Sequence, residues 1–283
     1  MAAPTARTRV AGVIGHPIAH SLSPTIFNAA FEDRGLDWVY VAFDVAEGGA
    51  GGALDAMRTL GLGGLSVTMP HKADVAAAVD ELTPEARALG AVNCVVPAAD
   101  GRLAGHNTDG AGFLAGLDAD LGIDVAGREV VVLGAGGAAR AIVAALAGAG
   151  PAGISIVNRD PGRAAAAAAL GGPRCRVAGS DALDDAEVVV NATSLGMAGV
   201  GGGAEGRLPA DPARLPPACV VADIVYHPLE TPFLLAARAR GLRVANGVGM
   251  LIGQAAVAFR LWTGDDPPVA AMRAAVDARL SPS

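Results

Sequence analysis

The fold of this protein is decided by the stretch Glu129-Val130-Val131-Val132-Leu133-Gly134-Ala135-Gly136-Gly137-Ala138-Ala139-Arg140. Apolar residues that favour β-structure lead into a cluster of glycines, and an alanine-rich amphipathic segment follows as far as Ala149. This order predicts a strand, a tight turn and a helix. The spacing of Gly134, Gly136 and Ala139 fits the pattern G-x-G-x-x-G/A, whose small residues let the backbone approach a pyrophosphate at the helix N-terminus.

The neighbouring sequence favours a dinucleotide site over an ordinary tight turn. The pattern alone is weak evidence, because the chain has 39 glycines in 283 residues. The helix, however, ends at 148–151, and a second apolar strand, 154–157, follows at a distance typical of a right-handed βαβ unit. A third strand is predicted at 187–193, where it ends in polar residues, and the glycine-rich tract 196–206 is predicted to be a mobile loop.

The residues after the second strand indicate which dinucleotide is bound. An NAD site has Asp or Glu about 20 residues after the glycines, whereas an Arg accommodates the 2′-phosphate of NADP. Here Asn158 lies 24 positions after Gly134, Arg159 follows it, and Arg163 can join in binding phosphate. The sequence therefore favours NADP. Asp160 leaves NAD open, although an Asp before a Pro is also typical of a helix N-cap.

Composition excludes several classes of protein. The length allows two domains, and although 52% of the residues are hydrophobic, no apolar run approaches the roughly 18 residues of a membrane span. A net charge of −7 argues against a nucleic-acid partner, which needs a basic surface. Three cysteines without a C-x-x-C pair predict thiols in a reducing compartment, so a cytoplasmic protein is expected. The five histidines lack ligand spacing, so no metal is expected.

The N-terminal part predicts a second α/β region with polar residues beyond its strands. Strands are predicted at 9–14, 38–45 and 63–70. Ser21-Leu22-Ser23-Pro24 follows the first of them. A Ser before a Pro is typical of a helix N-cap, but two hydroxyls beyond the carboxyl end of a strand can equally bind a small polar ligand.

A second polar group includes Lys72, the only lysine in the chain. Lys72 follows the third strand, Asn93 lies at the start of a predicted hairpin, and Asp109 opens a helix. Each has an ordinary alternative, since Lys72 can be a solvated residue at a helix start and Asp109 a charge that the helix dipole favours. Their shared place beyond strand ends makes them candidates for a site.

Eight motifs, taken in chain order, resemble one family. They are Ser21-Leu22-Ser23, Ser66-Val67-Thr68-Met69-Pro70-His71-Lys72, Gly90-Ala91-Val92-Asn93, Asn107-Thr108-Asp109-Gly110, Gly134-Ala135-Gly136-Gly137-Ala138-Ala139, Asn158-Arg159, Asn191-Ala192-Thr193-Ser194, and Gly249-Met250-Leu251 with Gln254. With them the chain resembles the shikimate dehydrogenases, the NADP-dependent reductases of 3-dehydroshikimate. The resemblance covers almost the whole chain.

This resemblance implies an α/β protein of two domains with the active site in the cleft between them. An N-terminal substrate-binding domain, 1–110, would be completed by C-terminal helices, 246–283, and a Rossmann NADP-binding domain, 111–245, would be inserted between these parts. The implied reaction is the reversible NADPH-dependent reduction of 3-dehydroshikimate to shikimate, in the biosynthesis of chorismate and aromatic amino acids. The protein would be a monomer or homodimer whose partner is this small-molecule substrate.

The resemblance also assigns site residues. The catalytic pair would be Lys72 and Asp109, with the ammonium stabilising the developing alkoxide. Substrate would be bound by Ser21, Ser23, Thr68, Asn93, Tyr226 and Gln254. The cofactor, NADP with NAD left open, would be bound by Gly134, Ala135, Gly136, Gly137, Ala138, Asn158, Arg159, Arg163, Thr193, Gly247 and Met250.

Some positions depart from the family pattern and keep alternatives open. Ser66 stands where many members have Asn, His71 where an aromatic residue is frequent, and Asp160 where a hydroxyl residue is usual. Relatives that act on quinate often have Ser-x-Thr where this chain has Ser-Leu-Ser, which leans toward shikimate. The alternatives are an NAD-preferring quinate/shikimate or aminoshikimate dehydrogenase and, more remotely, a non-catalytic NADP-binding regulator, against which Lys72 and Asp109 argue.

Overall fold

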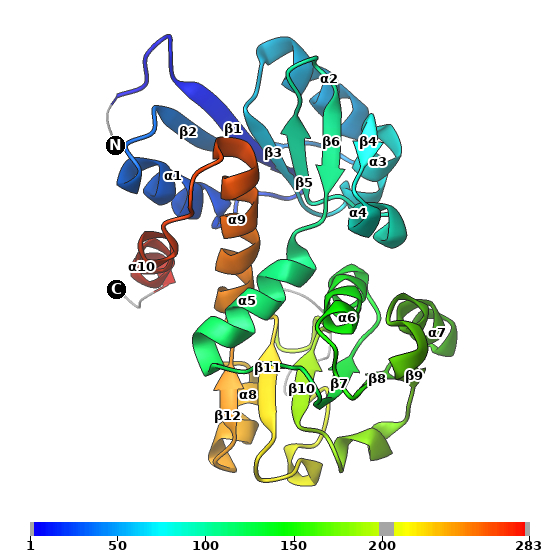
Figure 1. Cartoon of the computed structure of the whole chain (residues 1–283). Coiled ribbons are helices and arrows are strands. Elements are labelled where there is room, and N and C mark those ends of the chain that lie inside the picture. The colour runs from blue at the N-terminus through cyan, green and yellow to red at the C-terminus, as the bar shows by residue number, and fades with distance from the viewer. Residues whose placement is uncertain (1–2, 198–206, 281–283) are drawn as a thin grey trace. The chain divides into compact units, whose positions relative to one another are not determined.

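The computed structural model describes residues 3–197 and 207–280, and most of the predicted mobile loop 196–206 lies outside them. The chain divides into two compact units, Met1–Thr108 with Gln254–Ser283 and Asp109–Gly253 (Figure 1). The predicted second change of domain, at 245/246, lies eight residues earlier than the observed one. Residues 246–253 belong to the second unit because an added Cβ at Gly249 or Gly253 would lie only 2.2 or 2.3 Å from atoms of helix α5 (Asp109–Leu121).

The first unit contains a mixed sheet in the order β2-β1-β3-β5-β6-β4. Its strands are β1 (Arg9–Gly15), β2 (Trp38–Asp44), β3 (Gly64–Val67), β4 (Glu81–Leu82), β5 (Cys94–Pro97) and β6 (Leu103–His106). Its helices are α1 (Ser23–Asp33), α2 (Ala50–Leu60), α3 (Lys72–Ala78), α4 (Pro84–Leu89), α10 (Val269–Leu280) and the larger part of α9 (Val248–Thr263). Strands β2, β1 and β3 are parallel, so their carboxyl ends share one edge, while β5 runs antiparallel to β3.

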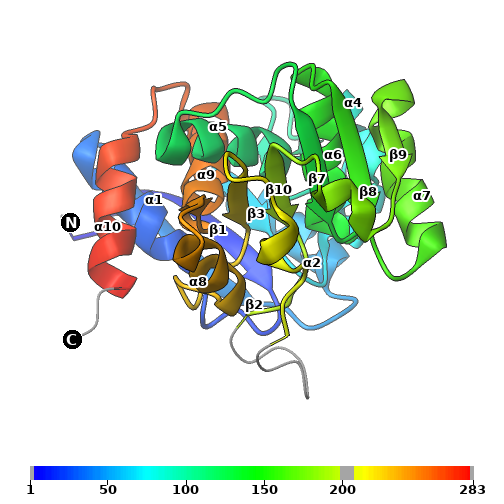
Figure 2. The ribbon, with the colours of Figure 1, turned by 90° about the horizontal axis from the view of Figure 1, so that it is seen from below.

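The two faces of this sheet have different cores. Leu54 and Met57 of α2 and Val75 of α3 pack against Leu65 and Val67 of β3 in an aliphatic cluster. The aromatic side chains of α1, β2 and α9 contact one another: Phe27 is stacked on Tyr40 with ring centroids 4.4 Å apart, and Trp262 lies 4.9 Å from Phe27. Helix α10 lies beside α1 in both ribbon views (Figures 1 and 2).

The second unit contains a parallel six-stranded sheet in the order β12-β11-β10-β7-β8-β9. The strands are β7 (Glu129–Leu133), β8 (Gly153–Val157), β9 (Cys175–Val177), β10 (Val188–Asn191), β11 (Val220–Asp223) and β12 (Arg243–Ala245). Besides α5, the helices are α6 (Gly137–Gly148), α7 (Pro161–Leu170), α8 (Pro232–Ala239) and 3₁₀ turns at Gly172–Arg174, Ser180–Leu183 and Pro212–Arg214. This order is that of a Rossmann fold, with the switch point between β7 and β10.

Alternation along β7 explains why helices cover both faces of this sheet. Val130 and Val132 pack into one cluster with side chains of α5, α6 and α7, whereas Val131 and Leu133 pack into a second cluster with side chains of α8. A parallel strand buried on both faces is expected to be apolar at every position. The predicted βαβ unit is therefore confirmed, but β4, β9 and β12 were not predicted, since they have only two or three residues each.

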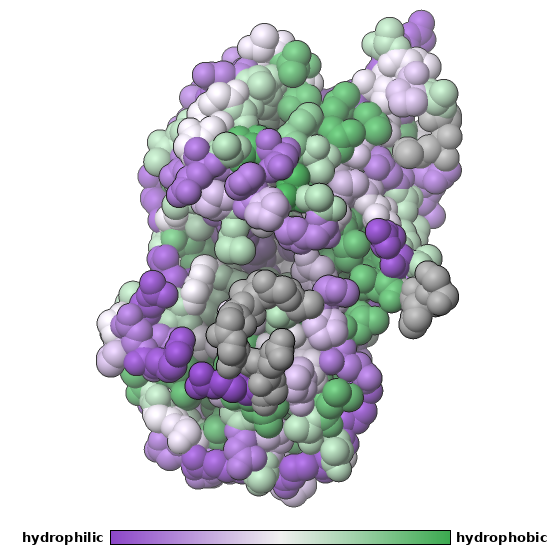
Figure 3. Space-filling view, turned by 180° about the vertical axis from the view of Figure 1, so that it is seen from behind, coloured by the Kyte–Doolittle hydropathy of each residue, from purple (hydrophilic) through white to green (hydrophobic). Residues whose placement is uncertain are grey.

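The surface is mixed in polarity. On the face drawn in Figure 3, hydrophobic residues form small groups separated by polar ones. Within 3–197 and 207–280, the most exposed large hydrophobic side chains are Met69 and Leu60, at 74% and 72%. No helix in this part of the chain is long and apolar enough to cross a membrane.

Gly64→Ala is expected to destabilise the first unit by about 1–3 kcal/mol through overpacking. An added Cβ would lie 2.4 Å from the Trp262 indole, which is held in place by a 3.0 Å hydrogen bond from its Nε1 to the Val95 carbonyl. Urea denaturation followed by tryptophan fluorescence measures this, because both tryptophans, Trp38 and Trp262, lie in this unit. The matched control is Gly52→Ala in α2, where the new methyl meets nothing within 4 Å and should stabilise by about 0.5 kcal/mol.

Candidate active site

Polar residues of the first unit lie just beyond the carboxyl ends of β1 and β3. Main-chain hydrogen bonds hold the two loops together, with Thr68 N donating to Ile14 O at 2.9 Å and His16 N to Met69 O at 3.0 Å. The predicted substrate residue Thr68 is half-buried in this arrangement.

The serines of the first loop are arranged differently from a helix cap. Of the two interpretations left open for Ser23, the helix cap does not hold, since Leu22 occupies the cap position and no side chain caps α1. Ser21 Oγ instead accepts a 3.3 Å hydrogen bond from Ser23 N. Both serines are half-buried, and the Ser23 hydroxyl does not cap α1.

Lys72 and Asn93 are joined through the start of β5. Val92 N donates to Lys72 O at 2.9 Å, and Val67 N donates to Asn93 O at 2.8 Å. The Asn93 side chain is 4% exposed and holds Thr108 by two bonds, Nδ2 to Thr108 Oγ1 at 3.0 Å and Thr108 N to Asn93 Oδ1 at 2.8 Å. The structure thus gathers Thr68, Lys72 and Asn93 and fixes the residue that precedes Asp109.

His71 anchors the start of the helix that carries Lys72. Its ring is fully buried, and its Nε2–H donates to the Val45 carbonyl at 2.7 Å. The buried Nδ1 has no hydrogen-bond partner within the described part of the chain. A histidine in this position therefore combines the packing of an aromatic ring with a hydrogen bond to the loop after β2.

In the second unit, the glycine cluster forms the turn between β7 and α6. Gly134 has φ +108°, and an added Cβ would lie 2.9 Å from the Ala192 carbonyl, so only glycine fits. At Gly136 and Gly137 an added Cβ would meet nothing within 4 Å. The first N–H groups of the twelve-residue helix α6 are therefore open to an anion, as a pyrophosphate requires.

The charged residues of the loop after β8 differ in their contacts. Asp160 caps α7, because its Oδ1 accepts from Arg163 N at 3.0 Å, and its other oxygen lies 3.7 Å from the Arg163 guanidinium. This confirms the cap interpretation of Asp160. Asn158 Nδ2 donates to the Asp160 carbonyl at 2.9 Å. Arg159 is exposed and has no ion-pair or hydrogen-bond partner among the described residues, so it can meet a phosphate.

Buried polar residues shape the turns after β10 and β11. Asn191 is fully buried, and its Oδ1 accepts from the N and Oγ1 of Thr193 at 3.1 and 2.7 Å. Asp223, 1% exposed, accepts from Val225 N at 3.0 Å and from Thr231 Oγ1 at 2.8 Å. Burial raises the pKa of the Asp223 carboxyl against these hydrogen bonds, which lower it. The next turn carries Tyr226, whose pKa is also raised by burial.

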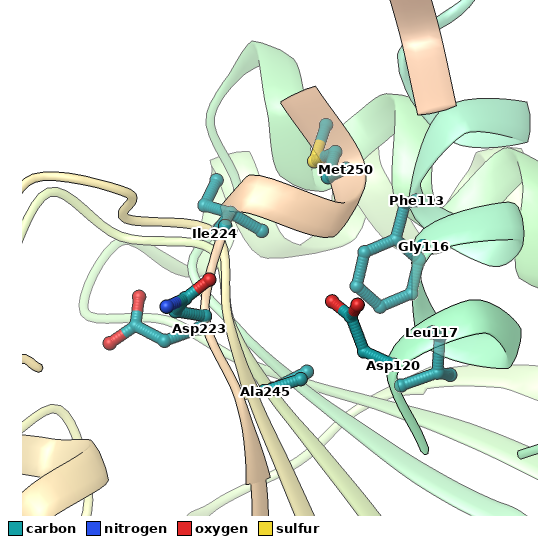
Figure 4. A pocket seen from close by; sticks show the side chains of 11 residues that line it. Phe113, Gly116, Leu117, Asp120, Asp223, Ile224, Ala245 and Met250 are labelled. Atoms are coloured by element: carbon teal, nitrogen blue, oxygen red, sulfur yellow. The ribbon is translucent and has the colours of Figure 1, made fainter. Parts of the chain in front are cut away.

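A cavity of about 10 Å³ lies where α5, the ends of β11 and β12, and the start of α9 meet (Figure 4). The predicted cofactor residues Gly247 and Met250 line it together with Phe113 and Ile224. Figure 4 shows the Asp120 carboxylate pointing toward this space from α5. The volume holds about one water molecule, so the cavity itself cannot hold a nucleotide or an organic substrate.

The supporting role of several buried polar residues was not predicted. Thr108, Asn191 and Asp223 hold turns through side-chain hydrogen bonds rather than facing a ligand. A polar residue that ends an apolar run, as in Val188–Asn191 and Val220–Asp223, is the signal that could have identified two of them. Within 3–197 and 207–280, no group of three or more His, Cys, Asp or Glu side chains is placed to hold a metal ion.

These features define a dinucleotide-binding α/β protein of two units with a lysine-containing polar site in the first. Family models give the particular family. The model of the shikimate dehydrogenase substrate binding domain matches residues 13–95, and that of the shikimate 5′-dehydrogenase C-terminal domain matches 247–276. A model described as NADP oxidoreductase, coenzyme F420-dependent, matches 129–199.

Individual proteins agree with the models. A shikimate dehydrogenase (NADP(+)) of Geobacter metallireducens is 47% identical over 98% of each chain. The crystal structure of shikimate 5-dehydrogenase from Thermus thermophilus with NADP(H) and shikimate has 39% identity and a TM-score of 0.87, covering 96% of this chain and 100% of that one. Quinate dehydrogenase of Corynebacterium glutamicum with NAD has 34% identity and a TM-score of 0.85, covering 96% and 99%. The chain belongs to the shikimate dehydrogenase family.

The stability of Asp223→Asn relative to wild type is expected to increase as the pH rises above 3.8, the usual pKa of the carboxyl. The folded pKa is raised, so the folded state holds the proton longer than the unfolded chain and wild-type stability falls as the carboxyl ionises. Asn retains an acceptor for Val225 N, whereas Asp223→Ala should cost about 1–3 kcal/mol because this N–H and the Thr231 hydroxyl lose their acceptor. Denaturation curves from acid to neutral pH measure both variants, and an Asn advantage that shrinks as pH rises would contradict the raised pKa.

Proposed function

We propose that this protein is an NADP-dependent shikimate dehydrogenase that reversibly reduces 3-dehydroshikimate to shikimate. The observation that carries the proposal is Lys72, which is the only lysine in a chain with 20 arginines and lies beside Asn93 beyond the strand ends of the first unit. A guanidinium remains protonated in proteins, whereas an ammonium can give up a proton and take it back. The one lysine of the chain thus stands where the proposed reaction needs proton transfer, while all its other basic Lys/Arg positions are arginine.

The residues of the second unit suit a dinucleotide. The open N-terminus of α6, without a side chain at Gly136 or Gly137, is the space that a pyrophosphate would fill. Bound NADPH supplies the hydride. Ala135 and Ala138 complete the turn, and Thr193, Gly247 and Met250 are assigned to the nicotinamide half of the cofactor by their resemblance to the family.

NADP is favoured over NAD by the loop after β8. The Asp160 carboxylate accepts from Arg163 N and is thus engaged as a cap, which draws it away from a ribose hydroxyl. Arg159 and Arg163 are exposed guanidinium groups that can bind a 2′-phosphate, and Asn158 holds the loop. These contacts support NADP as the preferred cofactor.

Lys72 and Asp109 carry the chemistry at the substrate. The Lys72 ammonium stabilises the negative charge that develops on the carbonyl oxygen and donates its proton to that oxygen. The Asp109 carboxylate orients the ammonium and accepts a hydrogen bond from a ring hydroxyl. Asn93 and Thr108 hold the turn that leads into Asp109.

The remaining assigned residues bind the substrate. Ser21 and Ser23 donate hydrogen bonds to the carboxylate, and Thr68, Tyr226 and Gln254 complete the contacts with the carboxylate and the neighbouring hydroxyl. The half-buried state of all five suits a site that excludes bulk water without being sealed. We place the protein in the cytoplasm, where its three free cysteines, Cys94, Cys175 and Cys219, remain thiols, and we expect a monomer or homodimer.

Turnover on four pairs of reactants tests this function. Purified protein is mixed with shikimate or quinate and with NADP⁺ or NAD⁺, and reduction of the nicotinamide is followed by absorbance. Rapid reduction of NADP⁺ by shikimate, with the other pairs slower, is expected. Preference for quinate or NAD⁺ would instead support the quinate/shikimate alternative, and binding of NADP⁺ without turnover on any substrate, including an aminoshikimate, would support a regulator.

Lys72→Ala is expected to lower kcat by at least 10²–10³-fold, the usual effect of losing one donor to a developing oxyanion. NADPH affinity should be unchanged, because no cofactor residue is altered. Lys72→Arg is the matched control, since it keeps the charge but cannot give up a proton to the substrate, and it should restore little activity. Wild-type turnover in either variant would contradict the assignment.

Because the chain has a single lysine, wild-type protein offers a second test of the same residue. Reductive methylation modifies only Lys72 and the chain's terminal amine. Activity should fall in step with modification at Lys72, measured by mass spectrometry, and saturating shikimate should slow both changes. Dimethylation leaves the ammonium its charge and one N–H, so full dimethylation of Lys72 with turnover retained would show that the reaction needs only one donor from this residue.

Arg159→Gln is expected to lower the affinity for NADP⁺ by about tenfold and to leave the affinity for NAD⁺ within twofold of wild type. The reason is that the guanidinium contacts only the 2′-phosphate. Titration of each nucleotide against intrinsic fluorescence or by calorimetry measures the change. Arg174→Gln, an exposed arginine at the far end of α7, is the control. An equal loss of affinity for both nucleotides would show that Arg159 does not bind the 2′-phosphate.

A further inference from the structure

A larger cavity of the second unit lies over β7, β8 and β9, on the face of the sheet opposite α6. It has a volume of about 220 Å³ and is lined by Glu129, Val131, Ser155, Arg176, Ala182 and Asp185. None of these residues belongs to the proposed substrate or cofactor site. A space of this size holds several water molecules or one small organic molecule.

The topology of the sheet leaves this space open. Strands β7, β8 and β9 lie in this order at one end of the sheet (Figure 1). Helix α8 packs against β11 and β12, and the connection from β9 to β10, residues 178–187, contains only the 3₁₀ turn Ser180–Leu183. Helices normally cover both faces of a parallel sheet. Here a short turn takes the place of a crossover helix, and the cavity lies beneath it.

Ser155 is a buried polar residue that faces this cavity. It is 2% exposed, and its neighbours Ile154 and Ile156 belong to the core cluster on the other face of the sheet. The Ser155 hydroxyl makes no hydrogen bond in the part of the chain that the structure describes. A buried hydroxyl without a partner costs free energy, and a ligand in the cavity would satisfy it.

The Glu129 carboxylate reaches from β7 across β8 on the same face. A Cβ added at Gly153 would lie 2.5 Å from Glu129 Oε2, so the glycine makes room for the carboxylate. Glu129 pairs with Gly153 and Val131 pairs with Ser155, which puts the carboxylate and the hydroxyl on one face two residues apart. Glu129 is half-buried, and its carboxylate has no ion pair or hydrogen bond among the described residues.

The charged residues of the cavity are separated by sign. Arg176 of β9 pairs with Ser155, and β9 lies about 10 Å from β7 across two strand spacings. Glu187 N donates to Glu129 O at 3.0 Å, which brings the nearby Asp185 to the end of β7 that carries Glu129. Within 3–197 and 207–280, neither Arg176 nor Asp185 forms an ion pair. The cavity thus has two carboxylates at one end and a guanidinium at the other.

We propose that this cavity is a second binding site, which takes a zwitterion whose ammonium and carboxylate are separated by an aliphatic chain, as in lysine. The ammonium binds between Glu129 and Asp185, and the carboxylate binds the Arg176 guanidinium and accepts from Ser155 Oγ. The aliphatic chain lies over the apolar side chains between them. The site is independent of the proposed reaction.

Charge complementarity selects this class of ligand over simpler ions. A diamine leaves the guanidinium of Arg176 without a partner and places a second cation beside it. A dicarboxylate places an anion beside Glu129 and Asp185. Like charges brought together in this way oppose binding, whereas a zwitterion of sufficient length pairs with both ends of the cavity.

Calorimetric titration of the wild-type protein with four compounds tests the ligand class. L-Lysine should bind as one molecule per chain with a Kd of about 1 mM or lower, and 6-aminohexanoate, which keeps both charged ends, should bind within about threefold of it. L-Norleucine lacks the distal ammonium and cadaverine lacks the carboxylate, so each should bind at least about tenfold more weakly. Lysine that does not saturate the protein, or norleucine that binds as well as lysine, would overturn the proposal.

Two variants locate the binding in this cavity. Glu129→Gln should lower the affinity for lysine to about that of norleucine, and Arg176→Gln should lower it to about that of cadaverine, because each removes the partner of one charged end. Arg174→Gln, an exposed arginine just before β9, is the matched control and should bind lysine within about twofold of wild type. Wild-type affinity for lysine in either cavity variant would place the binding elsewhere and overturn the proposal.

Ser155→Ala tests the buried hydroxyl separately. The Kd for lysine should rise about three- to tenfold, the effect of losing one hydrogen bond. The Tm of the free protein should be unchanged or higher, because a buried hydroxyl without a partner has been removed. An unchanged Kd together with a lower Tm would show that the hydroxyl supports the fold and would overturn its assignment to the ligand.

Discussion

The close approach of β7 and β10 at Gly134 is the constraint on which the cofactor edge depends. With φ at +108° and the Ala192 carbonyl 2.9 Å from where a Cβ would be, the chain can turn sharply enough to start α6 only with glycine there. The same turn lies at the switch point of the sheet, where neighbouring crossovers run in opposite directions and leave strand ends uncovered. One backbone position therefore sets both the direction of α6 and the opening above it.

Buried polar side chains provide the rigidity that a binding site requires. Asn93, Asn191 and Asp223 are at most 4% exposed, and each makes two or more hydrogen bonds to a turn beside a strand end. Burying such groups is costly unless they are satisfied, and satisfied groups define one conformation of the turn. These buried hydrogen bonds hold the turns that carry the proposed site residues.

Much of the fold and of the proposed site could be predicted because it depends on local patterns. The βαβ unit follows from the apolar strand and glycine spacing around Gly134, and the Asp160 cap follows from the adjacent proline. Strands of two or three residues, such as β4, were missed because they have no detectable periodicity. The interpretation of Ser23 as a cap failed because a local preference gave way to the course of the loop between β1 and α1.

The sequence by itself determined the family, the dinucleotide-binding unit and the identification of Lys72 as a candidate site residue. These depend only on which residue types occur at which spacing. Only the tertiary structure decided that the Asn93 amide bonds to Thr108 and that the Trp262 indole donates to the Val95 carbonyl. The physical reason is that hydrogen-bond partners far apart in sequence are selected by strand pairing and burial, which no local spacing encodes.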